Sequence, residues 1–189
     1  GSISAANGSA NVTLTVTGTG SINLSTANQV TADTLSVTTA QGDADLGTNI
    51  ATLVADVVGN LTVGETDNLV IGQNVVTNPD GAAGSDINIT AGGDITGTGR
   101  ISAANGASNV TLNATGDITL NGSSGQIVGD LLNVTAAHAT LNTTVEALTV
   151  NVSGNLFLVE TDDLFIDAAG VTAGNVTITT ENGSLEELV

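Results

Sequence analysis

The chain of 189 residues contains no Cys, Lys, Trp or Tyr, and it has a single Arg, a single His and a single Pro. Without Cys it can form neither a disulfide nor a thiolate zinc site, and it has no thiol nucleophile. Two Phe are its only aromatic residues, so the stacking platforms of single-strand and sugar-binding clefts are missing.

The formal net charge is −18. This charge excludes a nucleic-acid binder, which needs clustered cations, and it argues against attachment to anionic lipid. No apolar run reaches the roughly 18 residues of a membrane span, so no membrane insertion is expected. The lack of a basic and apolar signal segment at the start suggests a fragment of a longer protein.

Alternation of apolar and polar residues is the main pattern of the chain. Hydrophobic residues make up 40 % of it, mostly Val, Leu, Ile and Ala. They recur at every second position in short segments such as V-T-L-T-V at 12–16 and I-N-I at 87–89. A period of two is typical of strands with one buried face, and Thr, Val, Asn and Gly are weak helix formers. The sequence therefore predicts an all-β protein with a thin aliphatic core.

The chain is an internal duplication. Two long stretches each occur twice: residues 3–14 return as residues 101–112 nearly unchanged, and residues 53–71 return as residues 148–166 with the same spacing of apolar residues, Gly-Asn and Glu-Thr-Asp. We therefore predict two repeat units, 1–99 and 100–189, that follow each other without a linker.

Turn residues separate the apolar segments within each unit. Gly59-Asn60 and Gly154-Asn155 occupy matching positions, and we expect them to form turns that use a positive φ. Residues 77–85 contain the only Pro and are expected to form an exposed loop.

A shorter spacing of about 16–23 residues runs through both units. The apolar segments begin near Val12, Leu35, Leu53 and Leu69, and again near Val110, Leu132, Leu148 and Leu164. One such coil cannot bury its own apolar face, whereas stacked coils form a continuous core. We therefore predict a parallel β-helix (β-solenoid) of roughly nine coils, about 40 Å long at ~4.8 Å per coil. The alternative is two tandem β-sandwich domains, since about 95 residues is the size of an immunoglobulin-like module.

A Gly-Asp/Asn-Ile/Leu-x-Leu pattern recurs in these segments. It occurs in N-V-T-L-N-A-T-G-D-I-T-L-N-G at 109–122, in N-I-T-A-G-G-D-I-T-G-T-G at 88–99 and in L-T-V-N-V-S-G-N-L-F-L at 148–158. These segments resemble repeats of filamentous-haemagglutinin-type adhesins and are similar to the passenger stalks of other large secreted bacterial surface proteins. The resemblance covers nearly the whole chain. It implies a right-handed parallel β-helix at the bacterial cell surface that forms a stalk or mediates adhesion.

From this resemblance we expect a structural or adhesive repeat segment of a large bacterial extracellular surface protein or fibre. The expected partners are neighbouring repeats or other copies, joined by end-to-end β stacking, because the ends of a solenoid have unpaired edges. Receptors or glycans on host or neighbouring cells are further expected partners. We expect no cofactor, no metal site and no catalytic residue.

An enzyme of the β-helix class is a weaker alternative. Polysaccharide lyases of that fold need basic side chains to neutralise a uronate and abstract its proton, and here only Arg100 and His138 qualify. They are roughly two coils apart, and we interpret His138, in T-A-A-H-A-T, as a turn or surface residue. No G-x-S-x-G motif is present.

An acidic motif recurs at one turn of each unit. It comprises Glu65 and Asp67 in E-T-D, and Glu160, Asp162 and Asp163 in E-T-D-D. Oxygen ligands crowded on a turn can hold calcium. The alternative, which we favour, is a solvated corner whose carboxylates keep the solenoid soluble and discourage sideways association of sheets.

Thr-x-Thr strings, as at 13–17 and 177–179, suggest a second alternative, the flat threonine face of an ice-binding solenoid. Thr is also a favourable outward residue in any strand. Because the strings do not keep a constant position in each coil, a regular ice-binding plane is not expected. We expect the Asn residues at the turns to stack into side-chain ladders between coils.

Overall fold

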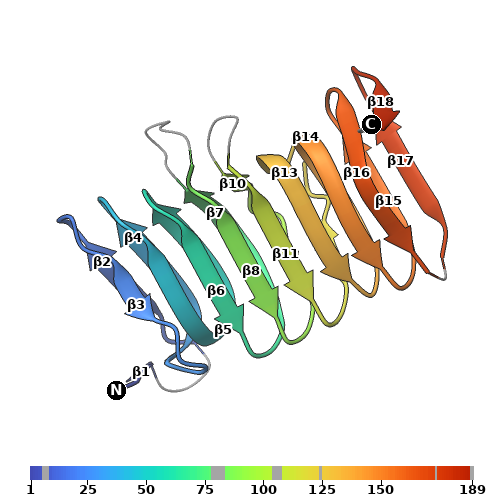
Figure 1. The fold of residues 1–189 in the computed structure, drawn as a ribbon. Coiled ribbons are helices and arrows are strands. Elements are labelled where there is room, and N and C mark those ends of the chain that lie inside the picture. Colours follow the sequence, from blue (N-terminus) through green and yellow to red (C-terminus); the bar gives the residue numbers. More distant parts are fainter. Residues whose placement is uncertain (6–8, 78–83, 104–107, 124, 173, 188–189) are drawn as a thin grey trace.

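The computed structural model describes residues 1–5, 9–77, 84–103, 108–123, 125–172 and 174–187, and within these residues every regular element is a β-strand. The strands are β1 (Ile3–Ser4), β2 (Val12–Val16), β3 (Ile22–Leu24), β4 (Val30–Thr39), β5 (Ala44–Val57), β6 (Leu61–Glu65), β7 (Leu69–Thr77), β8 (Ile87–Ala91), β9 (Ile95–Gly97), β10 (Ile101–Ala103), β11 (Val110–Ala114), β12 (Ile118–Leu120), β13 (Ile127–Ala136), β14 (Ala139–Val152), β15 (Leu156–Glu160), β16 (Leu164–Val171), β17 (Val176–Thr180) and β18 (Leu185–Glu187). Figure 1 shows them stacked coil upon coil, with β1 and β18 at opposite ends. The loop predicted at 77–85 lies largely outside the described residues.

All strand pairs are parallel, and each pair joins one coil to the next. One column of paired residues runs from end to end: Ile22, Ala44, Leu61, Ile87, Val110, Leu132, Leu148, Ile166 and Glu187. Its steps give a β-solenoid of about eight turns, close to the roughly nine coils expected. The predicted all-β parallel solenoid is thus confirmed. The two-sandwich alternative is wrong, because the sheets of such sandwiches are antiparallel.

The coils differ in length more than the sequence pattern predicted. Successive members of this column are between 16 and 26 residues apart, against the 16–23 expected. The longest step, from Leu61 to Ile87, includes the segment 77–85. The ladder stays intact across this long step, because the strands on either side of the segment, β7 and β8, keep their pairing with the neighbouring coils.

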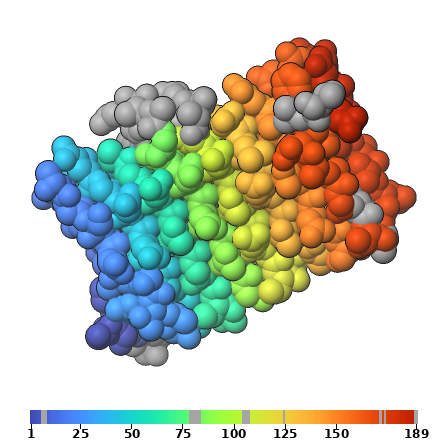
Figure 2. Space-filling model, viewed as in Figure 1, coloured from blue at the N-terminus to red at the C-terminus, as the bar shows by residue number. Residues whose placement is uncertain are grey.

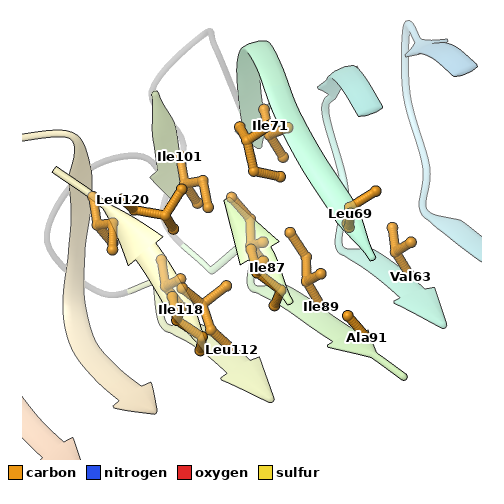
Figure 3. Close-up of a cluster of buried hydrophobic side chains, with 14 of the residues drawn as sticks. Val63, Leu69, Ile71, Ile87, Ile89, Ala91, Ile101, Leu112, Ile118 and Leu120 are labelled. Atoms are coloured by element: carbon orange, nitrogen blue, oxygen red, sulfur yellow. The ribbon is translucent and has the colours of Figure 1, made fainter. Parts of the chain in front are cut away.

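Along most strands alternate residues point inward, and together they form one mainly aliphatic core. In β8, for example, Ile87, Ile89 and Ala91 are buried, whereas Asn88 and Thr90 are exposed. Figure 3 shows buried side chains of neighbouring coils gathered between the strands. Each fully buried Leu, Ile or Val contributes about 1.5–3 kcal/mol to folding, and stacking supplies the cover that a single coil lacks.

The two repeat units stack directly on each other. Across residue 99, β7 pairs with β10, β8 with β11 and β9 with β12. The parallel ladder therefore continues without interruption where the second copy of the sequence begins.

Equivalent residues of the two units lie on different faces of the solenoid. The column that contains Leu14 reaches Ile101 after four steps, through Val37, Ala55 and Val75. Leu112, the sequence equivalent of Leu14, belongs to the next strand of that coil, β11. One unit therefore makes four coils and one further strand, so a feature that occurs in both units faces two different sides.

Gly59 and Gly154 do not have the positive φ that the sequence predicted. In the described part of the chain, positive φ occurs at Asn28 and at four glycines other than Gly59 and Gly154. A Cβ on Gly59 would instead meet Asp43 Oδ1 and, at 2.6 Å, the carbonyl carbon of Gly42 in the neighbouring coil. These positions therefore require Gly because the corners stack too closely for a side chain.

Candidate functional site

Glu65 joins two coils from inside a corner. Its side chain is only 4 % exposed. Oε2 accepts hydrogen bonds from the Thr48 hydroxyl (2.7 Å) and the Ile50 N–H (2.9 Å) of the neighbouring coil. Oε1 accepts from the N–H groups of Thr66 (2.8 Å) and Asp67 (3.1 Å). Hydrogen bonds to an ionised acceptor are roughly twice as strong as neutral ones, so the carboxylate holds this corner to the coil beside it.

Glu160 occupies the same place in the second unit and is 0 % exposed. Its Oε2 accepts from the Thr143 hydroxyl (2.7 Å) and the Val145 N–H (3.2 Å), and its Oε1 accepts from the Thr161 N–H (2.8 Å). Burial raises the pKa of Glu160 to about 7, although the bonds from Thr143, Thr161 and Val145 lower it. A side-chain hydrogen bond with Asp162 raises it further. Burial at this corner therefore favours the protonated form of the Glu160 carboxyl group.

The interpretation of both glutamates as solvated corner residues is wrong, because their carboxylates lie in the core. Of the acidic residues at these corners, only Asp67, Asp162 and Asp163 are exposed. Among the described residues, no group of three or more His, Cys, Asp or Glu side chains could hold a metal ion. The buried carboxylates of Glu65 and Glu160 are engaged by protein donors, so the structure gives the calcium hypothesis no support.

The raised pKa of Glu160 predicts a specific dependence of stability on pH. Its value is about 7 in the folded protein, against an ordinary 4.5, so the folded state binds the proton more tightly than the unfolded state. The contribution of Glu160 to the free energy of unfolding is thus expected to fall by about 3 kcal/mol as pH rises from 4.5 to 7. The Thr143 hydroxyl can accept a hydrogen bond from the protonated carboxyl group and donate to Val159 O, which lies 3.4 Å away.

Urea unfolding of the wild type and of Glu160→Gln at several pH values tests this dependence. The general relief of acidic repulsion at low pH affects both proteins and cancels in their difference. The wild type is expected to gain stability relative to the variant as pH is lowered through 7. A difference that stays constant between pH 8 and pH 5 would contradict the assignment.

Side chains at two corners form ladders along the solenoid. In each ladder, a side-chain acceptor receives a hydrogen bond from the backbone N–H of the equivalent residue in the next coil, at 2.7–3.1 Å. The first ladder contains Ser21, Asp43, Asn60, Asp86 and Asn109. The second contains Asn68, Asp94, Asp117, His138, Asn155 and Asn175. The sequence predicted ladders of Asn alone, but any short side chain with a suitable acceptor fits these positions.

His138 is a member of the second ladder. Its Nδ1 accepts a hydrogen bond from the Asn155 N–H (2.8 Å), and its own backbone N–H donates to Asp117 Oδ1 (3.1 Å). The neutral ring in this arrangement carries its proton on Nε2. The residue is exposed and directly precedes β14, which agrees with its interpretation as a turn or surface residue.

Replacement of His138 tests the ladder. His138→Asn is expected to change the free energy of unfolding by less than about 0.5 kcal/mol, because Asn holds this position in other coils. His138→Leu leaves the Asn155 N–H without its acceptor and is expected to cost about 1 kcal/mol. Urea unfolding of the two variants provides the measurement. Equal stability of both variants would show that the ladder bond contributes nothing.

The structure does not bring Arg100 and His138 together. Arg100 is exposed and forms no ion pair within the described residues. It precedes the column of Ile101, whereas His138 precedes the column of Ala139, which is a different corner. A lyase-type site that combines these two side chains is therefore not supported.

Gln126 is a buried polar residue that the sequence analysis missed. Its Nε2 donates to Gly99 O (2.7 Å), and its Oε1 accepts from the Gly122 N–H (2.6 Å). In the first unit, Gln29 Nε2 donates in the same way to Gly1 O (2.9 Å). A Gln directly precedes a strand in both units, and this repeated position could have identified the residue from the sequence. The structure shows that its side chain holds the start of the coil in place by hydrogen bonds.

Each unit has an open groove on its surface, and the two grooves are lined by equivalent residues. The first, of about 490 Å³, is lined among others by Asn49, Ile50, Ala51, Asp67 and Asn68. The second, of about 510 Å³, is lined by their equivalents Thr144, Val145, Glu146, Asp162 and Asp163. A side-chain hydrogen bond with Asp130 raises the pKa of Glu146, and the first groove has Ala at that place. Because the groove chemistry differs between units, the duplication does not preserve a common binding site here.

Outward columns of the sheet are chemically mixed. One contains Asn23, Asp45, Thr62, Asn88, Thr111, Asn133 and Thr149. Another contains Thr34, Thr52, Val70, Thr96, Thr119, Thr140, Phe157 and Thr177, so that Val70 and Phe157 interrupt its threonines. Neither column is a continuous row of threonines, so these faces do not support the ice-binding alternative.

Comparison with known proteins adds no relative: no family model, no curated protein and no solved structure matches this chain. In the part of the chain that the structure describes, no helix is long and apolar enough to cross a membrane. The fold alone therefore defines its class, which is that of the parallel β-solenoids.

Proposed function

We propose that this chain is a structural and adhesive repeat segment of a large bacterial extracellular surface protein or fibre, and that it acts as a rigid stalk. The observation that carries the proposal is the parallel ladder that continues across the boundary between the units. Several strands join each coil to the next, with hydrogen bonds directed along the stack. Bending or stretching the stack must therefore strain many of these bonds together.

The surface suits such a role. Figure 2 shows successive coils side by side as one closely packed body, and outward residues are mainly Thr, Asn, Ser and Asp. A net charge of −18 keeps neighbouring stalks apart in solution. The resemblance of the repeats to those of filamentous-haemagglutinin-type adhesins supports the location at the bacterial cell surface, with receptors or glycans of other cells as partners.

A display experiment tests the stalk. A small binding module is anchored to a bacterial surface either through this chain or through a flexible Gly/Ser linker of about 50 residues, whose r.m.s. end-to-end distance is close to the length of the solenoid. Over a length of about 40 Å the chain is expected to hold the module clear of the surface and to increase the capture of ligand-coated beads. Equal capture through the flexible linker would contradict the proposed function.

A further inference from the structure

Both ends of the solenoid expose side chains at core positions. At the last coil, Val176 is 52 % exposed and Leu185 is 50 % exposed. At the first coil, Ile3 is 37 % exposed. The residues paired with them one coil further in are all buried: Leu156, Leu164 and Val30. The exposure of these side chains therefore arises because no further coil packs against them among the described residues, and not from a change in the strand pattern.

The chain itself contains a covered copy of the same junction. Where the second unit begins, β8 pairs with β11 through Ile87 and Val110, and β9 pairs with β12 through Ile95 and Ile118. Ile87 and Ile95 are 1 % and 0 % exposed.

The correspondence between the two junctions follows from the repeat. The segment D-I-N-I-T at 86–90, which includes most of β8, matches N-V-T-I-T at 175–179, which includes most of β17. Likewise, Leu69 pairs with Ile95 as its equivalent Leu164 pairs with Leu185. Strands β2 and β3 are in turn the equivalents of β11 and β12. The exposed last coil therefore corresponds to the coil of the first unit on which the second unit stacks. The first coil of the chain corresponds to the coil of the second unit that stacks on it.

We propose that a second copy of this chain stacks its first coil on the last coil of another copy, head to tail, in the register of the internal junction. The resulting pairs are Val12 with Val176, Leu14 with Ile178, and Ile22 with Leu185. This contact covers the apolar side chains at both ends and continues the parallel ladder. It extends the proposed function by naming the partner. If the chain is monomeric in solution, the proposed end-to-end contact is wrong. The display experiment uses a single chain and therefore tests the proposed stalk function independently.

The polar ladder fits the same register. At the internal junction, the Asn109 N–H donates to Asp86 Oδ1 (2.7 Å). The equivalents of these two residues at the joint are Asn11 and Asn175, and Asn175 already continues the ladder from Asn155 (2.9 Å). The net charge of −18 on each copy opposes association, and salt screens this repulsion. Association is therefore expected to increase with ionic strength.

Sedimentation velocity of end-blocked variants tests the joint. The wild type is expected to form oligomers that grow with concentration and with salt. Val176→Glu blocks the last coil and Leu14→Glu blocks the first, so each variant alone is expected to remain monomeric. Their equimolar mixture is expected to form dimers only, because it offers one intact pair of ends. Circular dichroism confirms that each variant remains folded. A wild type that stays monomeric, or a Val176→Glu variant that associates like the wild type, would overturn the proposal.

A cross-linking experiment tests the register without altering the core. The chain has no Cys, and the outward residues Thr13 and Thr177 face each other in the proposed joint, as Thr111 and Asn88 do internally. Thr13→Cys with Thr177→Cys is expected to give disulfide-linked oligomers on oxidation. The matched control, Thr15→Cys with Thr177→Cys, is out of register and is expected to lose most of this linkage. Equal linkage in both, or none in either, would reject the register.

Discussion

Replacing Glu65 by Gln is expected to lower the free energy of unfolding by about 3 kcal/mol, whereas Glu160→Gln at pH 8 is expected to change it by less than about 1 kcal/mol. The two residues are sequence equivalents and both are buried. The expected difference arises from the donors around each carboxylate.

At Glu65, each oxygen accepts at least one backbone N–H. Oε2 faces the Ile50 N–H, and Oε1 faces those of Thr66 and Asp67. The amide group of Gln would place an NH₂ against one of these donors in either orientation. A buried N–H then loses its acceptor, and the corner must open to hydrate it.

At Glu160, one orientation of Gln satisfies every donor. Oε1 lies 2.8 Å from the Thr161 nitrogen and 3.3 Å from the Val145 nitrogen, so it can accept from both. The NH₂ group would replace Oε2 and donate to the Thr143 hydroxyl. Gln also avoids the cost of ionising a carboxyl whose pKa is raised to about 7 by burial.

Urea unfolding of the two variants in the same buffer is the measurement, and each variant serves as the control for the other. If Glu65→Gln were as stable as Glu160→Gln, the charge-assisted bonds at the first corner would not have the assigned importance. If Glu160→Gln were the more damaging of the two, the proposed hydrogen-bond exchange at the second corner would be wrong.

A second large effect is expected from Gly59→Ala, which should destabilise the protein by about 3 kcal/mol. The new Cβ would meet the carbonyl carbon of Gly42 at 2.6 Å, and backbone of a neighbouring coil cannot move aside alone. Gly64→Ala is the matched control in the same coil. Its Cβ would lie 3.8 Å from Leu46 O, an ordinary contact, so its stability is expected to stay within about 0.5 kcal/mol of the wild type.

Thermal and urea unfolding of these variants also separate two explanations for the Gly. If Gly59 were needed for a positive φ, Gly59→Asn would be tolerated, because Asn adopts that conformation readily. Since the contact with Gly42 is the reason, Gly59→Asn is expected to be at least as destabilising as Gly59→Ala. A stable Gly59→Asn variant would restore the turn explanation.

The all-β fold, the stacking of coils and the aliphatic core could be predicted because a period of two is a local property of the sequence. The same pattern contained the correct position of Glu65, which continues the inward phase of Leu61 and Val63. The acidic side chain nevertheless led to the expectation of a solvated residue, because a buried carboxylate is stable only where hydrogen-bond donors surround it. Those donors come from Thr48 and Ile50, one coil away, and their approach cannot be read from a single coil.

The role of His138 and the rotation between the units also could not be predicted from a single coil. The ladder partner of His138 is Asn155, in the next coil, so the bond depends on how the coils align. The shift of Leu112 to a different face from Leu14 depends on the summed lengths of four coils. Small errors in the length of each coil accumulate, and the sequence alone therefore predicts the repeat but not the side on which it lies.

The distance between spin labels at Asn23 and Asn133 tests the continuous solenoid most directly. Both are outward members of one column and lie five steps apart, across the boundary between the units. At ~4.8 Å per step, their Cα atoms should be about 24 Å apart. Double electron–electron resonance is expected to give one narrow distribution near this value. A broad distribution, or a mean well beyond it, would contradict a single stack of coils and would favour two separate domains.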